Sequence, residues 1–525
     1  MASIISTESA SCTRGNVDAK PHPRGIADFT PHPCGIASPA GVVAAESARH
    51  RWGRCQLSWR TVTRFPHPLD HTMPTRRTES AVSRRRFQTA AIAATGTFVS
   101  RPNLTAASPA GEGGIGEERS ANGSLELLVV GVANRAAANL AGVSGQKIVG
   151  LCDVDARYLD KAAATHPDAR RFVDYREMID AMAESADGIV VSTADHHHAP
   201  AAAMAMRRGL HAYVEKPLAH TVAETRLLTD LAKRHDVVTQ MGTQIHAGEN
   251  YRRVVELIRS DAIGPVRKVY VWVGKAWGGG QRPKRIDPVP DHLDWDRWIG
   301  PAPMRPYAKA AYHPAQWRRW WDFGGGTLGD MGCHYMDLPF WALGLTTPNR
   351  VVAEGPPPHP ETAPTGVTVR YAFTPRAVLN QNDAPELELV WMDGDHAPKT
   401  IEGVDVPTGG GVLFVGDDGK LLSTYSSYQL LPEDQFADFT PPEPSIARSI
   451  GHHAEWIAAC RGEGKTTCPF EYSGRLSESV LLGNVAHRCG QAFQYDGEHG
   501  TANQPAAAAL LTKPYREGWD PATLT

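Results

Sequence analysis

The sequence lacks three features that would assign it to a common class of protein. No stretch is long and apolar enough to cross a bilayer, so no stable membrane span is expected. The eight cysteines form no CxxC pair and no Cys/His spacing of the zinc type, so neither a metal site nor a disulfide framework is predicted. The formal net charge is only -3, which gives no reason to expect nucleic acid as a partner.

The chain does have enough apolar sequence for packed cores. It contains 525 residues, of which 42% are hydrophobic and 21% charged. This length and composition are typical of two or three globular domains rather than of a disordered protein.

The first 123 residues have the composition of a leader. Residues 1–72 are rich in Pro, His, Ser and Arg without an apolar period, so we expect them to be unstructured, and we expect translation to begin at Met73. Residues 73–123 hold the string Ser-Arg-Arg-Arg-Phe at 83–87, which resembles a twin-arginine export signal, followed by a short apolar stretch and small residues. We therefore predict contact with the export machinery and a periplasmic or cell-envelope location.

Residues 124–245 alternate apolar strands with helices. Strands are predicted over residues 125–130, 147–152, 188–193 and 211–214, with a helix over 201–209 between the last two. This alternation predicts an α/β domain with a doubly wound parallel sheet of the Rossmann type. Ligands of such sheets bind at the carboxyl ends of the strands.

The first strand leads into a turn that could hold a dinucleotide. The turn begins with Gly131 and continues through Ala133, Asn134 and Arg135 into a helix, and Asp153 ends the next strand about twenty residues later. Small residues let the backbone approach a pyrophosphate at the helix N-terminus, and an acid in this place accepts ribose hydroxyls.

The turn departs from the Gly-x-Gly-x-x-Gly pattern, because Ala133 and Ala136 replace the second and third glycines. By itself this motif is weak. Asp153 would repel a 2′-phosphate, so NAD is the expected cofactor, whereas Arg135 and Arg157 leave NADP open.

From residue 246 the pattern changes to strands with few intervening helices. The segments are a helix over 248–263, an alternating strand over 266–273, further strands over 350–354, 366–373, 387–392 and 411–423, and a last helical region over 452–490. Residues 246–525 are therefore expected to form an α+β domain with an open, mainly antiparallel sheet.

Four segments carry a specific resemblance. They are Ser-Thr-Ala-Asp-His-His-His-Ala at 192–199, Glu-Lys-Pro-Leu-Ala at 215–219, Gly-Thr-Gln-Ile-His at 242–246, and the D-x-x-x-H pattern of Asp330 and His334 behind a glycine-rich turn. They resemble the glucose–fructose oxidoreductase/inositol dehydrogenase/MocA family over about residues 124–525. The resemblance implies a nicotinamide cofactor, an open sheet beside the Rossmann domain and a homo-oligomer.

The resemblance also implies roles for single residues. Thr193, Asp195, His198 and Glu215 would line the cofactor cleft, and Lys216 would reach both the nicotinamide ribose and the reacting hydroxyl. Pro217 could follow Lys216 through a cis bond. A metal site at the triple histidine is disfavoured, because consecutive loop residues cannot easily face one ion.

Asp330 and His334 share one face of a predicted helix at i and i+4. Removal of a hydride from a carbinol carbon requires a group that takes the hydroxyl proton, and a histidine oriented by a carboxylate is suited to this. Lys216 would stabilise the developing alkoxide. Eight of the 13 tryptophans fall within residues 272–341, which suits sugar rings, although core packing accounts for them equally well.

We therefore predict an NAD(P)-dependent oxidoreductase that acts on a secondary alcohol of a sugar, sugar alcohol or related polyol. Because free NAD is scarce outside the cytoplasm, a tightly bound cofactor is expected. Two alternatives remain: an NAD-dependent glycosidase that uses transient oxidation, and a non-catalytic sugar-sensing protein on the same fold. The sequence does not specify the polyol, the reaction direction or the oligomeric state.

Overall fold

The structure is a computed structural model, and it describes residues 123–374 and 386–525. The predictions for residues 1–72 and for the export signal within 73–123 lie outside the described residues. Within the described part of the chain, no helix combines the length and the apolarity needed to cross a membrane.

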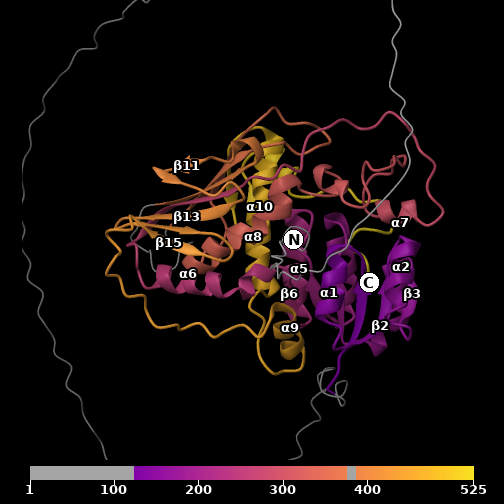
Figure 1. The fold of residues 1–525 in the computed structure, drawn as a ribbon. Helices are drawn as coiled ribbons and strands as arrows, with labels where there is room; N and C mark the ends of the chain where they lie inside the picture. Colours follow the sequence, from indigo (N-terminus) through magenta and orange to yellow (C-terminus); the bar gives the residue numbers. More distant parts are fainter. Residues whose placement is uncertain (1–122, 375–385) are drawn as a thin grey trace, which may run out of the picture. The chain divides into compact units, whose positions relative to one another are not determined.

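The first domain is built on a six-stranded parallel sheet with the order β3-β2-β1-β4-β5-β6 (Figure 1). Its strands are β1 (Glu126–Val130), β2 (Lys147–Cys152), β3 (Arg170–Phe172), β4 (Gly188–Val191), β5 (His211–Val214) and β6 (Thr239–Met241). β4 is buried along its whole length, as expected for a parallel strand covered on both faces. The predicted doubly wound Rossmann sheet is confirmed.

Helices connect these strands. They are α1 (Arg135–Gly142), α2 (Ala156–Ala163), α3 (Tyr175–Met182), α4 (His198–Arg207) and α5 (Val222–Arg234). α5 begins with a capping box, in which the Thr221 hydroxyl accepts from the backbone of Glu224 and the Glu224 carboxylate accepts from the backbone of Thr221. This cap fixes the start of α5 directly after the Glu-Lys-Pro turn.

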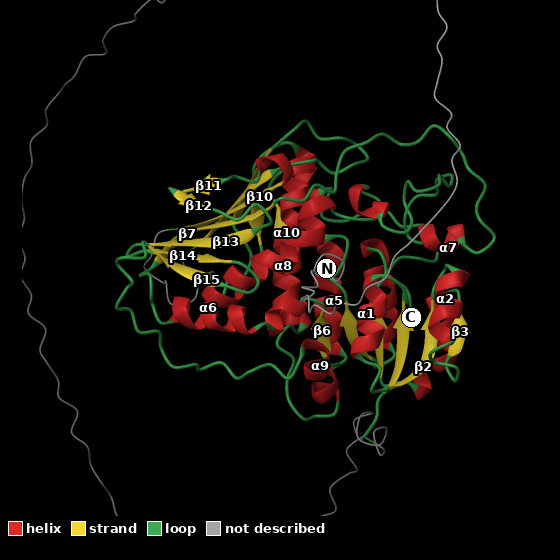
Figure 2. Cartoon of the chain, in the orientation of Figure 1, coloured by secondary structure: helices red, strands yellow, loops and turns green. Residues whose placement is uncertain are grey.

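The second domain contains a nine-stranded mixed sheet (Figure 2). In sheet order the strands are β15 (Tyr428–Leu431), β14 (Lys420–Ser423), β13 (Gly411–Gly416), β7 (Val266–Val273), β10 (Leu387–Asp393), β9 (Thr368–Phe373), β8 (Arg350–Glu354), β16 (Phe493–Asp496) and β17 (Thr501–Ala502). β7 and β10 run parallel, and the other neighbouring pairs are antiparallel. The mainly antiparallel sheet is thus confirmed.

Two predicted segments of this domain prove to be two elements each. The strand expected over 411–423 is the hairpin β13–β14, closed by a hydrogen bond from the Gly416 amide to the Gly419 carbonyl (2.9 Å). The helical region expected over 452–490 divides into α9 (His452–Cys460) and α10 (Phe470–Cys489). Pro469 immediately precedes α10, where a residue without an amide hydrogen starts a helix more readily than it continues one. A minor hairpin of β11 (Thr400–Ile401) and β12 (Val404–Asp405) completes the strands described.

The helices of the second domain include α6 (Glu249–Arg259), α7 (Trp295–Ile299), α8 (Gly326–Leu343) and α11 (Pro505–Ala508). Almost every residue of α8 is buried, so this helix is part of the core rather than of its surface. The residues Asp330 and His334 lie on it, and its position therefore decides the geometry of the predicted site.

Glycines allow α8 and α10 to approach closely. A Cβ atom added at Gly332 of α8 would lie 2.8 Å from Val480 Cγ2 of α10. A Cβ atom added at Gly483 of α10 would lie 2.6 Å from Leu328 Cδ2 of α8, and it would also collide with the buried Tyr371 hydroxyl. The helix contact thus depends on the absence of side chains at these two positions.

We expect Gly483→Leu to lower the free energy of unfolding by about 1–3 kcal/mol, because the new side chain must displace α8 or Tyr371 in a packed core. Urea unfolding followed by tryptophan fluorescence measures this change. The matched control is Gly464→Leu, since a Cβ atom at Gly464 meets no atom within 4 Å. Equal stability of the two variants would contradict the close packing described.

Candidate active site

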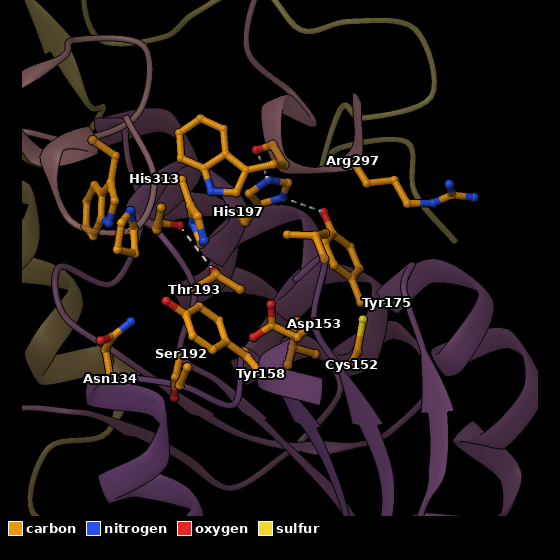
Figure 3. A pocket seen from close by; sticks show the side chains of 18 of the residues that line it. Asn134, Cys152, Asp153, Tyr158, Tyr175, Ser192, Thr193, His197, Arg297 and His313 are labelled. Atoms are coloured by element: carbon orange, nitrogen blue, oxygen red, sulfur yellow. Dashed lines mark hydrogen bonds between the residues drawn. The ribbon is translucent and has the colours of Figure 1, made fainter. Parts of the chain in front are cut away.

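A cavity with about 1070 Å³ of empty space opens at the carboxyl edge of β1, β2 and β4. This volume includes space that is open to solvent. Figure 3 shows Asp153, Ser192 and Thr193 of the first domain around the same space as Arg297 and His313 of the second domain. Six of the residues predicted to bind the cofactor line it: Gly131, Ala133, Asn134, Arg135, Asp153 and Thr193.

The turn after β1 can only be built with glycine at its first position. Gly131 has a φ of +82°, and a Cβ atom there would lie 2.7 Å from the backbone oxygen of Ser192. The following amide, that of Val132, donates to Asp153 Oδ2 (3.1 Å), and the Asp155 amide donates to Asp153 Oδ1 (2.9 Å). Burial raises the pKa of Asp153 to about 6. The turn, the helix start and the acid are thus arranged as a dinucleotide requires.

The other predicted cofactor residues lie outside the lining of this cavity. Arg157 is directed at Asp155, with which it forms two side-chain hydrogen bonds (3.0 and 2.7 Å). Glu215 is buried and accepts from Arg135 Nε, Asn139 Nδ2 and Gln244 Nε2, each at 2.9 Å. Burial alone would raise its pKa, but Arg135 and Lys216 hold the pKa of Glu215 down at about 2. Glu215 therefore does not line the cavity, but it holds the side chain of Arg135, which does.

The three consecutive histidines are structural contacts. His196 Nε2 and His197 Nε2 both donate to the carbonyl of Trp298 (3.1 and 2.9 Å), and His198 Nδ1 donates to the carbonyl of Pro217 (2.8 Å). His197 also lines the cavity. The triple histidine thus joins the loop after β4 to the second domain and to the Glu-Lys-Pro turn.

Lys216 and Asp330 meet across the two domains. Lys216 Nζ donates to Asp330 Oδ1 (3.0 Å) and to the Asp330 carbonyl (2.6 Å), and Arg318 Nε donates to the same carboxylate oxygen (2.9 Å). Burial opposes ionisation, but Lys216 and Arg318 hold the pKa of Asp330 well below its ordinary value. The Lys216–Pro217 peptide bond is cis, as the sequence suggested. Asp330 is therefore a permanent counter-ion for two cations.

His334 lies one helical turn further along α8 and is only 8% exposed. Its Nδ1 atom has no hydrogen-bond partner among the described residues, while its carbonyl accepts from the Tyr251 hydroxyl (3.0 Å). Burial and the nearby Lys216 ammonium lower the pKa of His334 to about 3. The imidazole is therefore neutral near pH 7 and able to accept a proton.

The partner of Asp330 differs from the expected one. The i and i+4 spacing suggested that Asp330 orients His334, but its described hydrogen bonds go to Lys216 and Arg318. Two cations attract a buried carboxylate more strongly than a neutral imidazole does. Asp195 belongs to the same cluster. It is 4% exposed, and burial raises its pKa to about 7 although Lys216 and Arg318 oppose this.

The sequence pattern indicated neither the contact of Arg318 with Asp330 nor a buried pair formed by His246 and Asp337. His246 Nδ1 lies 3.0 Å from the Asp337 carboxylate, which also accepts from the Tyr472 hydroxyl (2.7 Å). Together with Cys468 Sγ, the His246 and Asp337 donor atoms lie within 4.8 Å of one another, which is a set that could hold a metal ion. Asp337 falls one turn after His334, so the helical period could have indicated it.

The segment 292–323, here called the cap, closes the cavity from the second domain. Its Asp294 amide donates to the Val154 carbonyl (2.9 Å), its His292 carbonyl accepts from the Ala156 amide (2.8 Å), and a β-bridge joins Leu293 to Asp155. An aromatic cluster holds the cap together, with Trp295 stacked on Trp298 at 4.7 Å between ring centroids. Of the eight tryptophans within residues 272–341, five are buried core residues: Trp272, Trp295, Trp298, Trp320 and Trp321.

The C-terminal tail, which is the segment 509–525 after α11, also borders the cavity. Arg516 Nη2 donates to Asp296 of the cap (2.7 Å), and Trp519 lines the cavity with the Arg176 guanidinium 3.8 Å from its ring centroid. The cavity is thus formed by the Rossmann turn, the cap and the tail.

Comparisons with known proteins agree with this architecture. The family model for the NAD-binding Rossmann fold of an oxidoreductase family matches residues 125–243, and the model for the C-terminal alpha/beta domain of that family matches residues 253–405. A glycosyl hydrolase family 109 protein from Shewanella pealeana is 26% identical over 202 residues, which are 35% of this chain and 44% of that protein. Another, from Saccharopolyspora erythraea, is 29% identical over 171 residues, or 30% and 36% of the two chains. The chain thus spans less than half the length of these relatives.

Solved structures share the fold. The WlbA dehydrogenase from Chromobacterium violaceum, in complex with NADH and UDP-GlcNAcA, has a TM-score of 0.51 at 16% identity and covers 72% of this chain and 97% of its own. The WlbA dehydrogenase from Bordetella pertussis, with the same ligands, has a TM-score of 0.50 at 16% identity, covering 71% and 99%.

The two family models together match just over half of the chain, in the order in which the two domains occur. The chain therefore belongs to the glucose–fructose oxidoreductase/inositol dehydrogenase/MocA family of oxidoreductases, with an NAD-binding Rossmann domain.

Proposed function

We propose that this protein moves a hydride between a nicotinamide cofactor and a secondary alcohol of a sugar, a sugar alcohol or a related polyol. The observation that carries the proposal is the buried, neutral imidazole of His334 within the field of the Lys216 ammonium, beside the cavity that the turn after β1 and Asp153 line. These are the proton acceptor and the electrostatic stabiliser that oxidation of an alcohol needs.

A nicotinamide nucleotide in the cavity supplies the hydride acceptor or donor. His334 takes the hydroxyl proton of the substrate, and Lys216 donates a hydrogen bond to the oxygen on which negative charge develops. Without substrate, Lys216 bonds to the carbonyl and the carboxylate of Asp330, so a bound hydroxyl can replace one of these contacts. Arg318 and Asp330 are positioning residues for Lys216.

Two features support a sugar-like substrate. The guanidinium of Arg318 lies 4.5 Å from the ring centroid of Trp317, and both side chains line the cofactor cavity. A ring face and a forked donor together suit the C–H face and the hydroxyls of a polyol. The structural relatives named above contain a sugar nucleotide as well as NADH.

NAD is the proposed cofactor rather than NADP. Asp153 lines the cavity at the end of β2, where an acid accepts the ribose hydroxyls of NAD and repels a 2′-phosphate. Arg157, which kept NADP open in the sequence, pairs with Asp155 and does not line the cavity. Arg135 does line it but is engaged by Glu215.

We expect His334→Asn and Lys216→Met each to lower kcat by about 10²–10⁴-fold while the protein still binds NAD, because the acid–base and electrostatic contributions are lost separately from cofactor binding. Steady-state kinetics on a polyol panel, read through the absorbance of reduced nicotinamide, measures the effect. His487→Asn is the control, since His487 is a buried histidine of α10 outside the cluster.

The same variants have a pH signature. Because burial and Lys216 lower the pKa of His334 to about 3, this base stays neutral as the pH falls from 8 to 5. The profile of kcat/KM for alcohol oxidation should therefore show no histidine-like inflection near pH 6.5. Asp195 has its own pKa of about 7, so the Asp195→Asn variant removes its contribution to the profile. If an inflection near pH 6.5 persists in Asp195→Asn and disappears in His334→Asn, the assignment of His334 as a base that is neutral throughout this range is refuted.

Transient oxidation during glycoside cleavage is the second candidate. One observation favours it: the curated relatives are glycosyl hydrolase family 109 proteins, and an alpha-N-acetylgalactosaminidase from Shewanella oneidensis is 28% identical over 131 residues, 28% of that protein. Matches this partial leave the activity of the whole protein a proposal.

The two candidates differ in their redox balance. We expect the NAD-loaded protein to form reduced nicotinamide in proportion to an oxidised polyol, and to release no free sugar from α- or β-N-acetylgalactosaminides. Chromatography of the products and nicotinamide absorbance measure both quantities in one incubation. Free sugar released catalytically without net nicotinamide reduction would exclude the first function and establish the second.

We further propose that the protein is exported in folded form with its cofactor bound. The cap and Trp519 support this, because both line the cavity and would contact a bound dinucleotide. The twin-arginine-like string at 83–87 supplies the route, since such signals serve folded proteins.

We expect native protein from the cell envelope to contain about one nicotinamide nucleotide per chain after exhaustive dialysis. Trp519→Ala should speed its release about tenfold or more, which corresponds to roughly 1.4 kcal/mol of lost contact. Mass spectrometry of the released nucleotide and of the N-terminal peptide measures retention and processing together. Leu524→Ala is the control within the same tail, and full loss of nucleotide from the wild-type chain would contradict retention.

A further inference from the structure

A second cavity lies beside the glycine-rich turn that precedes α8. Its walls come from the start of α5, from α10, from the turn itself and from the tail, and they include Trp321, Gly325, Asn484, Arg488, Thr512 and Lys513. It shares no lining residue with the cofactor cavity. We call it the rear cavity.

The rear cavity contains a cation without a counter-ion. Arg488 is partly buried near the end of α10, with its guanidinium 5.1 Å from the ring centroid of Trp321. Among the residues that the structure describes, no carboxylate forms an ion pair with it. Burial lowers the pKa of Arg488.

The other charged groups of the wall are already paired. Lys513 Nζ lies 2.9 Å from Glu224 Oε1 and donates to His220 Nδ1 (2.8 Å), and Asp322 forms an ion pair with Arg305. Glu224 and Asp322 thus each form an ion pair with another cation, and neither of them neutralises the charge of Arg488. The pKa of His220 is lowered by burial and further by Lys513 and Arg488, as expected in a positive potential.

An arginine without a counter-ion in the wall of a cavity can pair with an anion that enters it. Its planar fork matches the two oxygens of a carboxylate or phosphate, and the Lys513 ammonium, which has three N–H groups, can donate one more hydrogen bond beside those to Glu224 and His220. The hydroxyls of Thr221 and Thr512 are further possible donors at the wall.

We propose that the rear cavity binds a small oxyanion, a carboxylate or a phosphate group, held by Arg488 and Lys513 beside the ring of Trp321. The site is separate from the cofactor and from the reacting alcohol, and it does not rest on the proposed function. Because Gly324 and Gly325 form part of its wall, and Asn484 Nδ2 donates to the Gly325 carbonyl (2.9 Å), an anion there contacts the turn from which α8 starts.

The test is calorimetric titration of the full-length, NAD-loaded protein with sodium phosphate and, separately, with sodium acetate at constant ionic strength. We expect one saturable site, and the better of the two anions identifies the group preferred. Arg488→Gln should weaken binding about tenfold or more, the loss typical of one charge-assisted contact. Arg475→Gln is the matched control, because Arg475 is an exposed arginine on the same helix that does not line the rear cavity.

Two results would overturn the proposal. One is the absence of saturable binding for both anions. The other is binding that persists in Arg488→Gln and Lys513→Gln but is lost in Arg135→Gln, which would place the anion in the cofactor cavity. Arg488→Lys, which keeps the charge but not the fork, provides a second measurement if Arg488→Gln does not fold, and it too should bind more weakly than the wild type.

Discussion

The contact between Lys216 and Asp330 is the interaction on which the site depends. It joins the end of β5 to α8, across 114 positions of sequence, and both side chains are about one-tenth exposed. Two cations, Lys216 and Arg318, share one carboxylate oxygen of Asp330, and Asp195 of the same cluster has its pKa raised by burial to about 7 and is only partly ionised near neutral pH, so some positive charge is left over. A buried surplus of this kind is unfavourable in the empty site and favourable once an alkoxide develops. The arrangement therefore stabilises the reacting state more than the resting one.

The same ammonium also fixes the protonation of His334. A histidine at this depth would lose its proton through burial alone, and the field of Lys216 lowers its pKa further. One cation thus stabilises the developing anion and adds to the burial that keeps the base neutral. The glycine contacts between α8 and α10 hold His334 at the depth where both effects operate.

Local patterns predicted most of the fold, because β4 and β7 owe their structure to the apolar periodicity of their own residues. The spacing of Asp330 and His334 likewise predicted a shared helix face. It could not predict the partner of Asp330, because Lys216 and Arg318 reach it through tertiary folding and a neutral imidazole competes poorly with them. For Arg157 a local contact decides the outcome. Its guanidinium pairs with Asp155, two residues away, and is therefore not directed at a cofactor phosphate. The cap has no periodic pattern, so its aromatic residues were as compatible with sugar binding as with the core in which most of them lie.

The cap and the tail around the cavity are relevant to both proposed reactions, the net oxidation of a polyol and the transient oxidation of a glycoside. Net oxidation of a polyol and transient oxidation of a glycoside begin with the same removal of a proton and a hydride, so Lys216 and His334 serve both equally. They differ in how the cofactor is restored: by a second substrate in one case, by return of the hydride in the other. Both restorations occur in place, and both gain from a cap and a tail that retain the nucleotide. A dehydrogenase that exchanges NAD with a free pool must release the nucleotide past the cap and the tail at every turnover. Under the proposed function, the contacts of the cap and the tail are compatible with in-place recycling, and they favour neither polyols nor glycosides.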